Sequence, residues 1–302
     1  MEAEKSLTLN DRNDEAILKN SAARLSIIVA ATLIALKTFT GFLTGSISVW
    51  ASLLDSAMDV FASTVNFIAV RASTRAADEN HPYGHGKAES LAGLFQSFVI
   101  AISGFFLLRE AVSRIIKPHP IDSEIIGIAT MIIAIIMSAL LVRRLRYVAD
   151  LTNSPALSAD ALHYSTDVYI NGGVLIALAL TLLTNWYLAD PLISLAIGFY
   201  IIWSAFTVAK DSVSILMDER LPLEVDDKVA EIVNRFRDEG VVGFHDLRTR
   251  RSGSEQFIDL HLEILKQKTF EEAHLLTVKV IRSIEAEIPR TKVNVHSDPV
   301  GY

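Results

Sequence analysis

Asp55 and Asp59 lie four residues apart within an apolar stretch, Ser48 to Val70, that is long enough to cross a bilayer. About a hundred residues later, His163 and Asp167 repeat the same spacing. Positions i and i+4 share one face of a helix, so both members of each pair could reach a common ligand. A carboxylate at membrane depth is costly unless it faces a partner, a water-filled cavity or an ion. Together the two pairs offer three carboxylates and one imidazole, which is enough for one four-coordinate divalent cation.

Two neighbouring charges leave alternatives open. Lys37, in the preceding apolar segment, could form an ion pair with one of the two aspartates. Two i,i+4 pairs in separate segments favour an ion site over that simple pairing. Asp160 lies one helical turn before His163 on a similar face, and spacing alone does not decide whether Asp160 or Asp167 points inward.

A second polar cluster follows the stretch that carries the aspartates. Asp78, His81 and His85 place three metal-ligand side chains within eight residues. Gly84 and Gly86 give the loop the conformational freedom to wrap around an ion. The alternative is a solvated loop whose histidines bind nothing. Since a loop is open to water, weak or transient metal binding is the form we expect.

A third set lies near the C-terminus, where four of the eight histidines of the chain gather. Its candidate metal ligands are His245, His261, His274, His296 and Asp298. His296 and Asp298 are two residues apart and so share one face of an expected strand, and His261 lies on the polar face of another. Any one of them could be an ordinary surface histidine, but the set favours a metal site. His119 is assigned no role.

Hydropathy determines the class of protein that positions these side chains. The chain has 302 residues, of which 51% are hydrophobic, and its mean hydropathy is +0.35. Apolar runs long enough to span a bilayer recur along the first two thirds of the chain. We expect six membrane spans: Ala22–Thr44, Val49–Val70, Leu91–Leu108, Ile125–Val142, Tyr169–Leu183, whose helix is expected to begin near Ser158, and Leu192–Val208.

Composition excludes several kinds of site and partner. The chain has no cysteine, so disulfides and thiolate ligands are excluded and any metal must use His, Asp or Glu. A net charge of −7 gives no support to nucleic-acid binding, and no organic cofactor is expected. The first 21 residues are polar, so the first span is expected to be a retained helix rather than a cleaved signal.

The distribution of Lys and Arg predicts the orientation in the membrane. The connections after spans two and four carry most of these residues, including Arg71, Lys87 and Arg146, while the opposite connections are poorer in them. An even number of spans then leaves both termini in the cytoplasm. We therefore expect a multi-pass protein with residues 1–21 as a cytoplasmic N-terminal segment and 22–218 as the transmembrane domain.

Residues 219–302 have the pattern of a soluble cytoplasmic domain. Helical periodicity over 225–237 is followed by strand patterns over 244–250 and 256–265. Thr269 and Glu272 form a capping-box start for a helix that runs to about residue 287, and 292–296 closes as a strand. The order α-β-β-α-β predicts a small two-layer α+β domain that could pair with a second copy of itself.

These patterns together resemble those of the cation diffusion facilitators, and within them the bacterial zinc/iron efflux pumps of the FieF/YiiP type. The resemblance covers nearly the whole chain, and its strings are specific jointly rather than singly. They are Ser52–Asp59 (SLLDSAMD), His81–Ser90 (HPYGHGKAES), Asp160–Asp167 (DALHYSTD), Gly243–Arg250 (GFHDLRTR) and Val295–Pro299 (VHSDP). One departure is Ser297, where close relatives often have Gln, and the N-terminal 20 residues are longer than the family needs.

The resemblance implies a homodimeric antiporter of the inner membrane that exports a divalent metal in exchange for protons. It implies a transport site of Asp55, Asp59, His163 and Asp167, which leaves Asp160 outside. It also implies a loop metal site of Asp78, His81 and His85, and an ion pair between Lys87 and Asp218 at the dimer interface. The C-terminal domain would be metallochaperone-like and would hold a dinuclear centre drawn from His245, His261, His274, His296 and Asp298.

The choice of metal and the coupling follow from the ligands. Three oxygens and one nitrogen in a tetrahedron suit Zn²⁺, with Fe²⁺, Cd²⁺ and Co²⁺ as further passengers. The resemblance implies zinc first and ferrous iron second. Because metal must displace protons from its ligands, binding is expected to depend on pH, with His163 as the natural exchange partner. The enzyme alternative, a metallohydrolase, lacks a His-Glu-x-x-His-like motif. The remaining alternative is a membrane-bound metal sensor or scaffold without flux.

Overall fold

The computed structural model describes residues 12–44, 47–117, 125–184, 186 and 188–301, with side chains described in 13–42, 56–117, 126–184, 186 and 188–301. The chain divides into two compact units, Met1–Val213 and Ser214–Tyr302, and each is treated by itself. His119 and the side chain of Asp55 lie outside the described residues.

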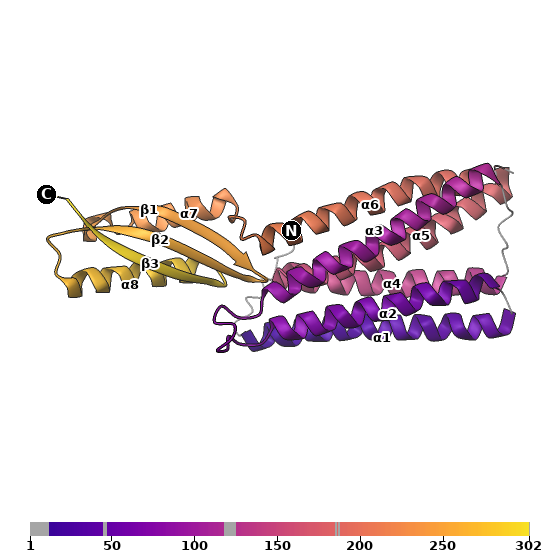
Figure 1. Cartoon of the computed structure of the whole chain (residues 1–302), viewed down its shortest axis with the longest axis horizontal. Coiled ribbons are helices and arrows are strands. Elements are labelled where there is room, and N and C mark those ends of the chain that lie inside the picture. The colour runs from indigo at the N-terminus through magenta and orange to yellow at the C-terminus, as the bar shows by residue number, and fades with distance from the viewer. Residues whose placement is uncertain (1–11, 45–46, 118–124, 185, 187, 302) are drawn as a thin grey trace, which may run out of the picture. The chain divides into compact units, whose positions relative to one another are not determined.

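The first unit consists of six long helices that run along one common direction (Figure 1). They are α1 (Arg12–Thr44), α2 (Ile47–Ser73), α3 (Lys87–Ile116), α4 (Ile125–Thr152), α5 (Pro155–Thr184) and α6 (Ala189–Leu216). Among the described residues, α1, α3, α4, α5 and α6 are long and apolar enough to cross a membrane. The sixth, α2, has 27 residues and carries Asp59 and several small polar side chains. The predicted helical membrane domain is confirmed.

Two helices begin earlier than the apolar patterns suggest. Helix α1 begins at Arg12, ten residues before the first predicted span, because polar side chains near its start have partners inside the protein. Lys19, for example, is only 3% exposed and forms ion pairs with Glu15 and Glu89. Helix α5 begins at Pro155, since Ser154 accepts a hydrogen bond from the backbone N–H of Leu157 (3.3 Å) and proline suits the first helical position.

Close helix packing in this unit depends on small residues. A Cβ atom added at Gly198 of α6 would lie 2.6 Å from Leu108 Cδ2 and 3.5 Å from the carbonyl oxygen of Gly104 on α3. Small residues at such crossings allow helix backbones to approach closely inside a membrane. The packed interior further along the unit is formed by large apolar side chains such as Leu141, Leu145 and Tyr164.

The second unit is the predicted α+β domain. Its elements are α7 (Leu223–Asn234), a short 3₁₀ turn η1 (Arg237–Glu239), β1 (Val241–Ser252), β2 (Glu255–Leu265), α8 (Phe270–Glu287) and β3 (Thr291–Val300). The predicted α-β-β-α-β order is confirmed, and so is the capping box of Thr269 and Glu272 at the start of α8. Strands β1 and β3 are longer than their predicted cores of 244–250 and 292–296.

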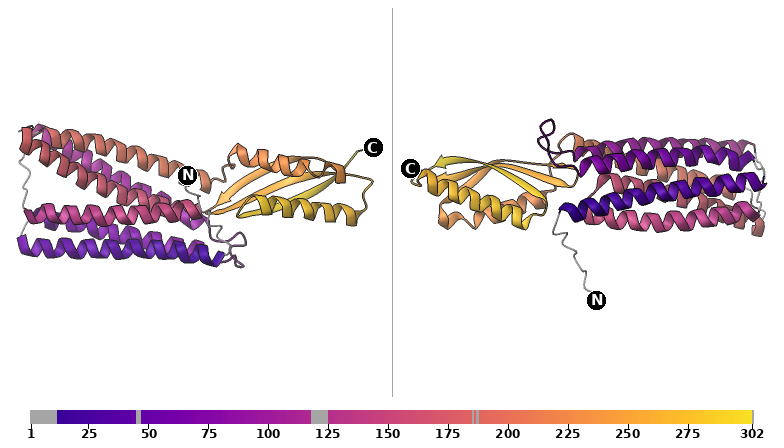
Figure 2. Two further views of the ribbon diagram at one scale, coloured as in Figure 1. Left: turned by 180° about the vertical axis from the view of Figure 1, so that it is seen from behind. Right: turned by 90° about the horizontal axis from the view of Figure 1, so that it is seen from below.

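The sheet has the order β1-β2-β3, with β2 antiparallel to β1 and parallel to β3. Helices α7 and α8 cover one face of the sheet (Figure 2). The side chains of β2 alternate as predicted, because Ile258, Leu260, Leu262 and Ile264 are all buried against the helices. The opposite face therefore presents the polar side chains of the strands.

Candidate metal sites

The first candidate site lies between α2 and α5. Asp59, His163 and Asp167 each place a ligand atom within 4.8 Å of the others, and His163 Nε2 lies 3.1 Å from Asp59 Oδ1. His163 is 3% exposed, whereas Asp59 and Asp167 are only partly buried, so the imidazole is shielded from solvent and the two carboxylates are less so. Asp55 lies one turn before Asp59 on α2 and is the remaining predicted member. The structure thus brings together the three predicted residues whose side chains it describes.

Asp160 and Lys37, the two charges that the sequence left open, have the following contacts among the described residues. Asp160 is fully buried, but it accepts a hydrogen bond from Ser26 Oγ on α1 (2.6 Å) and does not belong to the group of three. Lys37 Nζ donates to Ser56 Oγ on α2 (2.7 Å). Spacing did not separate Asp160 from Asp167; in the folded chain it is Asp167 that lies with Asp59 and His163.

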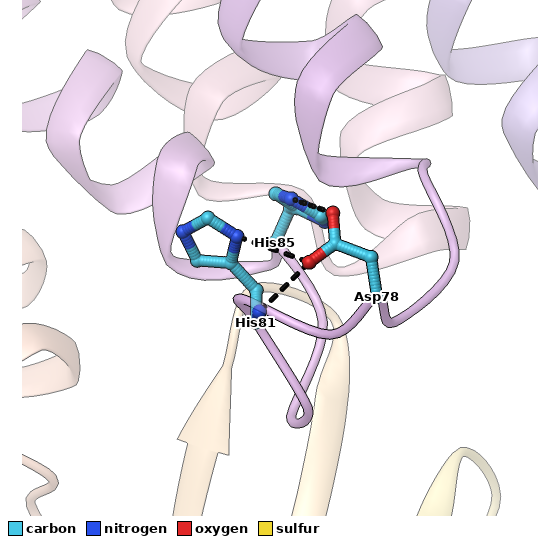
Figure 3. A group of neighbouring side chains, drawn as sticks. All are labelled: Asp78, His81 and His85. Carbon is cyan, nitrogen blue, oxygen red and sulfur yellow. Dashed lines mark hydrogen bonds and ion pairs between the residues drawn. The ribbon is translucent and has the colours of Figure 1, made fainter.

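The second candidate site is the connection between α2 and α3, shown in Figure 3. Both rings face the Asp78 carboxylate, with His81 Nδ1 3.3 Å from Oδ1 and His85 Nε2 3.3 Å from Oδ2. The backbone N–H of His81 also donates to Asp78 Oδ1 (2.7 Å), and this bond holds the pKa of the carboxyl below its usual range. Gly84 has φ +84°, a left-handed conformation that favours glycine and returns the chain toward His85. The three predicted residues therefore form a compact group with a deprotonated carboxylate at its centre.

The third candidate site crosses the open face of the sheet. Strand pairing places His245 of β1 opposite His261 of β2, and His261 opposite His296 of β3. The ring centroids of neighbouring histidines are 5.1 Å and 4.8 Å apart. Asp298 lies among them, with Oδ2 3.0 Å from His261 Nδ1 and 3.5 Å from His245 Nε2, and Oδ1 3.3 Å from His296 Nε2. Three imidazoles around one carboxylate are a donor set that suits zinc or a similar ion.

His274 is not brought into this third group. It lies on α8, where its ring stacks on Phe270 with centroids 6.4 Å apart and planes 13° apart. Glu263, which was not predicted, lies closer to the histidines, with Oε1 3.4 Å from His245 Nδ1. A signal for Glu263 was available, because period-two alternation places it on the same polar face as His261. Asp246 also lies close enough to His245 and His261 to share an ion with them.

The residues predicted for the dimer interface are placed as follows. Lys87 is the first residue of α3, directly after the loop site. Asp218 follows α6 with a left-handed backbone (φ +57°), and its carboxylate lies 3.4 Å from Arg250 Nη1 of β1.

Comparison with known proteins shows the family to which this chain is related. The family model described as "Cation efflux transmembrane domain" matches residues 23–217, and the one described as "Cation efflux protein, cytoplasmic domain" matches residues 221–300. The cation-efflux pump FieF of Salmonella schwarzengrund is 41% identical over 282 residues, which cover 93% of each chain. FieF of Escherichia coli (strain K12 / DH10B) is 40% identical over the same length, and that of Cronobacter sakazakii is 40% identical over 290 residues, which cover 95% of each chain. The chain therefore belongs to the cation efflux family, whose members are membrane transporters.

Proposed function

We propose that this protein exports a divalent metal cation from the cytoplasm in exchange for protons. The observation that carries the proposal is the meeting of Asp59, His163 and Asp167 at one point between α2 and α5, with His163 buried. Carboxylates and an imidazole gathered inside a membrane domain are costly unless an ion or protons bind there. Asp55, one turn from Asp59, would complete a four-coordinate transport site.

The donor set supports zinc as the first substrate. Three carboxylate oxygens and one imidazole nitrogen suit tetrahedral Zn²⁺, and Fe²⁺ is the second choice, with Cd²⁺ and Co²⁺ as further passengers. Mg²⁺ and Ca²⁺ prefer six or more oxygen ligands and fit this set less well.

Proton coupling follows from competition for the same atoms. A metal binds the deprotonated forms of His163, Asp59 and Asp167, so protons and metal exclude each other from the site. Metal taken up from the cytoplasm would leave when the site opens to the more acidic side and protons reach His163 and a carboxylate. The proton gradient would then drive export.

The other two sites would regulate or stabilise the transporter. The loop site (Asp78, His81, His85) is open to water, which supports transient binding. The site on the sheet would hold one or two zinc ions on His245, His261, His296 and Asp298, and His274 would have to be brought to it by a rearrangement or by a second copy. We further propose a homodimer with a Lys87–Asp218 ion pair at its interface, in the bacterial inner membrane with both termini cytoplasmic.

Metal uptake into sealed vesicles tests this function. The purified protein is reconstituted into liposomes, a pH gradient is imposed, and entry of Zn²⁺, Fe²⁺ (under anaerobic conditions) and Mn²⁺ is measured singly and in competition. We expect Zn²⁺ and Fe²⁺ uptake that requires the gradient and is lost in Asp59→Ala. The matched variant His274→Ala should keep uptake. Metal binding without any flux would instead support the membrane-bound sensor.

A further inference from the structure

A buried ion pair of opposite charges links α1 to α3 and has no part in the proposed exchange. Lys19 Nζ lies 3.0 Å from Glu89 Oε1, and the two side chains are 3% and 1% exposed. Lys19 also contacts Glu15, one turn earlier on α1 (2.9 Å). Taking two charges out of water costs more than their attraction returns unless further hydrogen bonds satisfy them. The further contacts that Glu89 makes therefore decide what this pair does in the fold.

The Glu89 carboxylate connects four parts of the first unit. Its Oε1 accepts from Lys19 of α1 and from Ser73 Oγ (2.7 Å), the last residue of α2. Its Oε2 accepts a hydrogen bond from Ser154 Oγ. Ser154 immediately precedes α5 and caps its N-terminus through the backbone N–H of Leu157. Charge-assisted hydrogen bonds of this kind are stronger and more directional than neutral ones.

These contacts lie at the base of the loop that carries one candidate metal site and at the start of α5, the helix that carries His163 and Asp167 of the other. The connection between Ser73 and Glu89 contains all three loop ligands, so the carboxylate closes the base of that loop. Ser154 fixes the start of α5, and His163 and Asp167 project from the same helix two to four turns further on.

We propose that Glu89 is a positioning residue for the transport site: its carboxylate holds the start of α5, through Ser154, against α1 and the base of the metal-binding loop. The inference rests on the proposed function, because it concerns the geometry of that site. Loss of the Glu89–Ser154 bond would let His163 and Asp167 shift relative to Asp59. Small displacements of reacting or binding groups are known to have large effects on rates and affinities.

Substitutions at both ends of the bond test the proposal. Ser154→Ala removes the donor, Glu89→Gln removes the charge of the acceptor but leaves the Ser154 cap in place, and Ser154→Thr keeps the hydroxyl. The matched control is Ser90→Ala, because Ser90 is fully buried beside Glu89 and its Oγ has no hydrogen-bond partner among the described residues. In proteoliposomes we expect Ser154→Ala and Glu89→Gln to raise the KM for Zn²⁺ by about threefold or more. Ser154→Thr and Ser90→Ala should behave as the parent.

A second measurement does not depend on transport. The chain contains no cysteine, so Ala159→Cys places a single thiol on α5 between Ser154 and His163, at a position that is fully buried. In the purified full-length protein, alkylation of this thiol should be faster by about threefold or more with Ser154→Ala or Glu89→Gln, because α5 opens more often. If labelling responds as expected in a protein that transports no metal, the proposed function fails, while the hold of Glu89 on the start of α5 is supported. The proposal would be overturned if Ser154→Ala and Ser90→Ala had equal KM values and equal labelling rates. It would also be overturned if Ser154→Thr, which keeps the hydroxyl, differed from the parent as much as Ser154→Ala does.

Discussion

At the scale of single residues, the candidate transport site combines groups whose charges would be unstable alone in a membrane. His163 and Asp59 lie 3.1 Å apart, and Asp167 completes the group of three. A buried imidazole between carboxylates can hold either a proton or a metal, and this exchange is the chemistry that the proposed function requires.

Replacement of His163, the nitrogen donor of the proposed transport site, tests the metal preference. His163→Asp would leave an all-oxygen site, and oxygen donors favour harder ions such as Mn²⁺ over Zn²⁺. We expect the ratio of Zn²⁺ to Mn²⁺ uptake in proteoliposomes to fall on the order of tenfold. His274→Ala is the control, since it removes a histidine from outside the membrane domain. An unchanged ratio in His163→Asp would remove His163 from the set of ligands.

Sequence patterns predict the site residues unevenly. The i,i+4 spacing identified Asp59 and His163 as candidates, because helix geometry places each on one helix face with a second possible ligand. Spacing could not separate Asp160 from Asp167, since the partner of Asp160 is Ser26, 134 residues earlier on another helix. The Glu89 carboxylate was missed for the same reason: its three partners lie on segments that only the tertiary fold brings together.

At the scale of elements, hydropathy predicted the helices well and their ends less well. An apolar run marks only the part of a helix that is surrounded by lipid or by apolar side chains. Helix α1 extends beyond that part into polar sequence, where Lys19 is paired with acidic residues inside the protein. In the second unit, alternation in β2 and the capping box of α8 are local signals, and both predictions are confirmed. The extra length of β1 and β3 comes from pairing with β2, which a single strand does not encode.

The crossing of α3 and α6 gives a prediction about packing. Gly198→Val would place side-chain atoms against Leu108, whose Cδ2 would lie 2.6 Å from the added Cβ, closer than real contacts allow. Overpacking of this kind costs about 1–3 kcal/mol, so we expect a lower melting temperature for the detergent-solubilised protein, followed by intrinsic fluorescence. Gly172→Val on α5 is the control, because nothing lies within 4 Å of a Cβ at that position. Equal melting temperatures for the two variants would contradict close packing of α3 against α6.

Contact between α7 and α8 gives a prediction about pH. Arg235 donates two hydrogen bonds to the Glu287 carboxylate (2.7 and 2.8 Å), and these bonds lower the pKa of Glu287 to about 2. Because the folded-state pKa is depressed from the usual 4.5, the stabilisation is fully present above pH 4.5 and is lost as the pH falls toward 2. Glu287→Gln should therefore lower the melting temperature of the second unit, followed in the full chain by circular dichroism, by an amount that shrinks below pH 4.5. Asp227→Asn, an exposed acid on α7, is the control. A difference that persists unchanged to pH 2 would exclude this ion pair as its cause.

At the scale of the whole molecule, the chain combines a helical membrane unit, which carries two candidate metal sites, with an α+β unit, which carries the third. The family membership joins both units in one transporter architecture. In the proposed function the first unit performs the exchange of metal for protons, and the histidines on the open sheet face of the second unit would serve sensing or pairing with a second copy. Loss of the candidate transport site in the first unit should therefore abolish metal flux, whereas loss of the histidines in the second unit should only change its rate.

Metal–proton exchange is tested most directly by simultaneous recording of Zn²⁺ entry and proton exit in the same proteoliposomes, with one dye for each ion. We expect proton counterflow in fixed proportion to Zn²⁺ entry, with both fluxes lost in Asp59→Ala. Both should be retained in Asp150→Ala, which removes an exposed carboxylate from α4. Zn²⁺ entry without proton counterflow, or equal fluxes in Asp59→Ala and the parent, would contradict the proposed exchange.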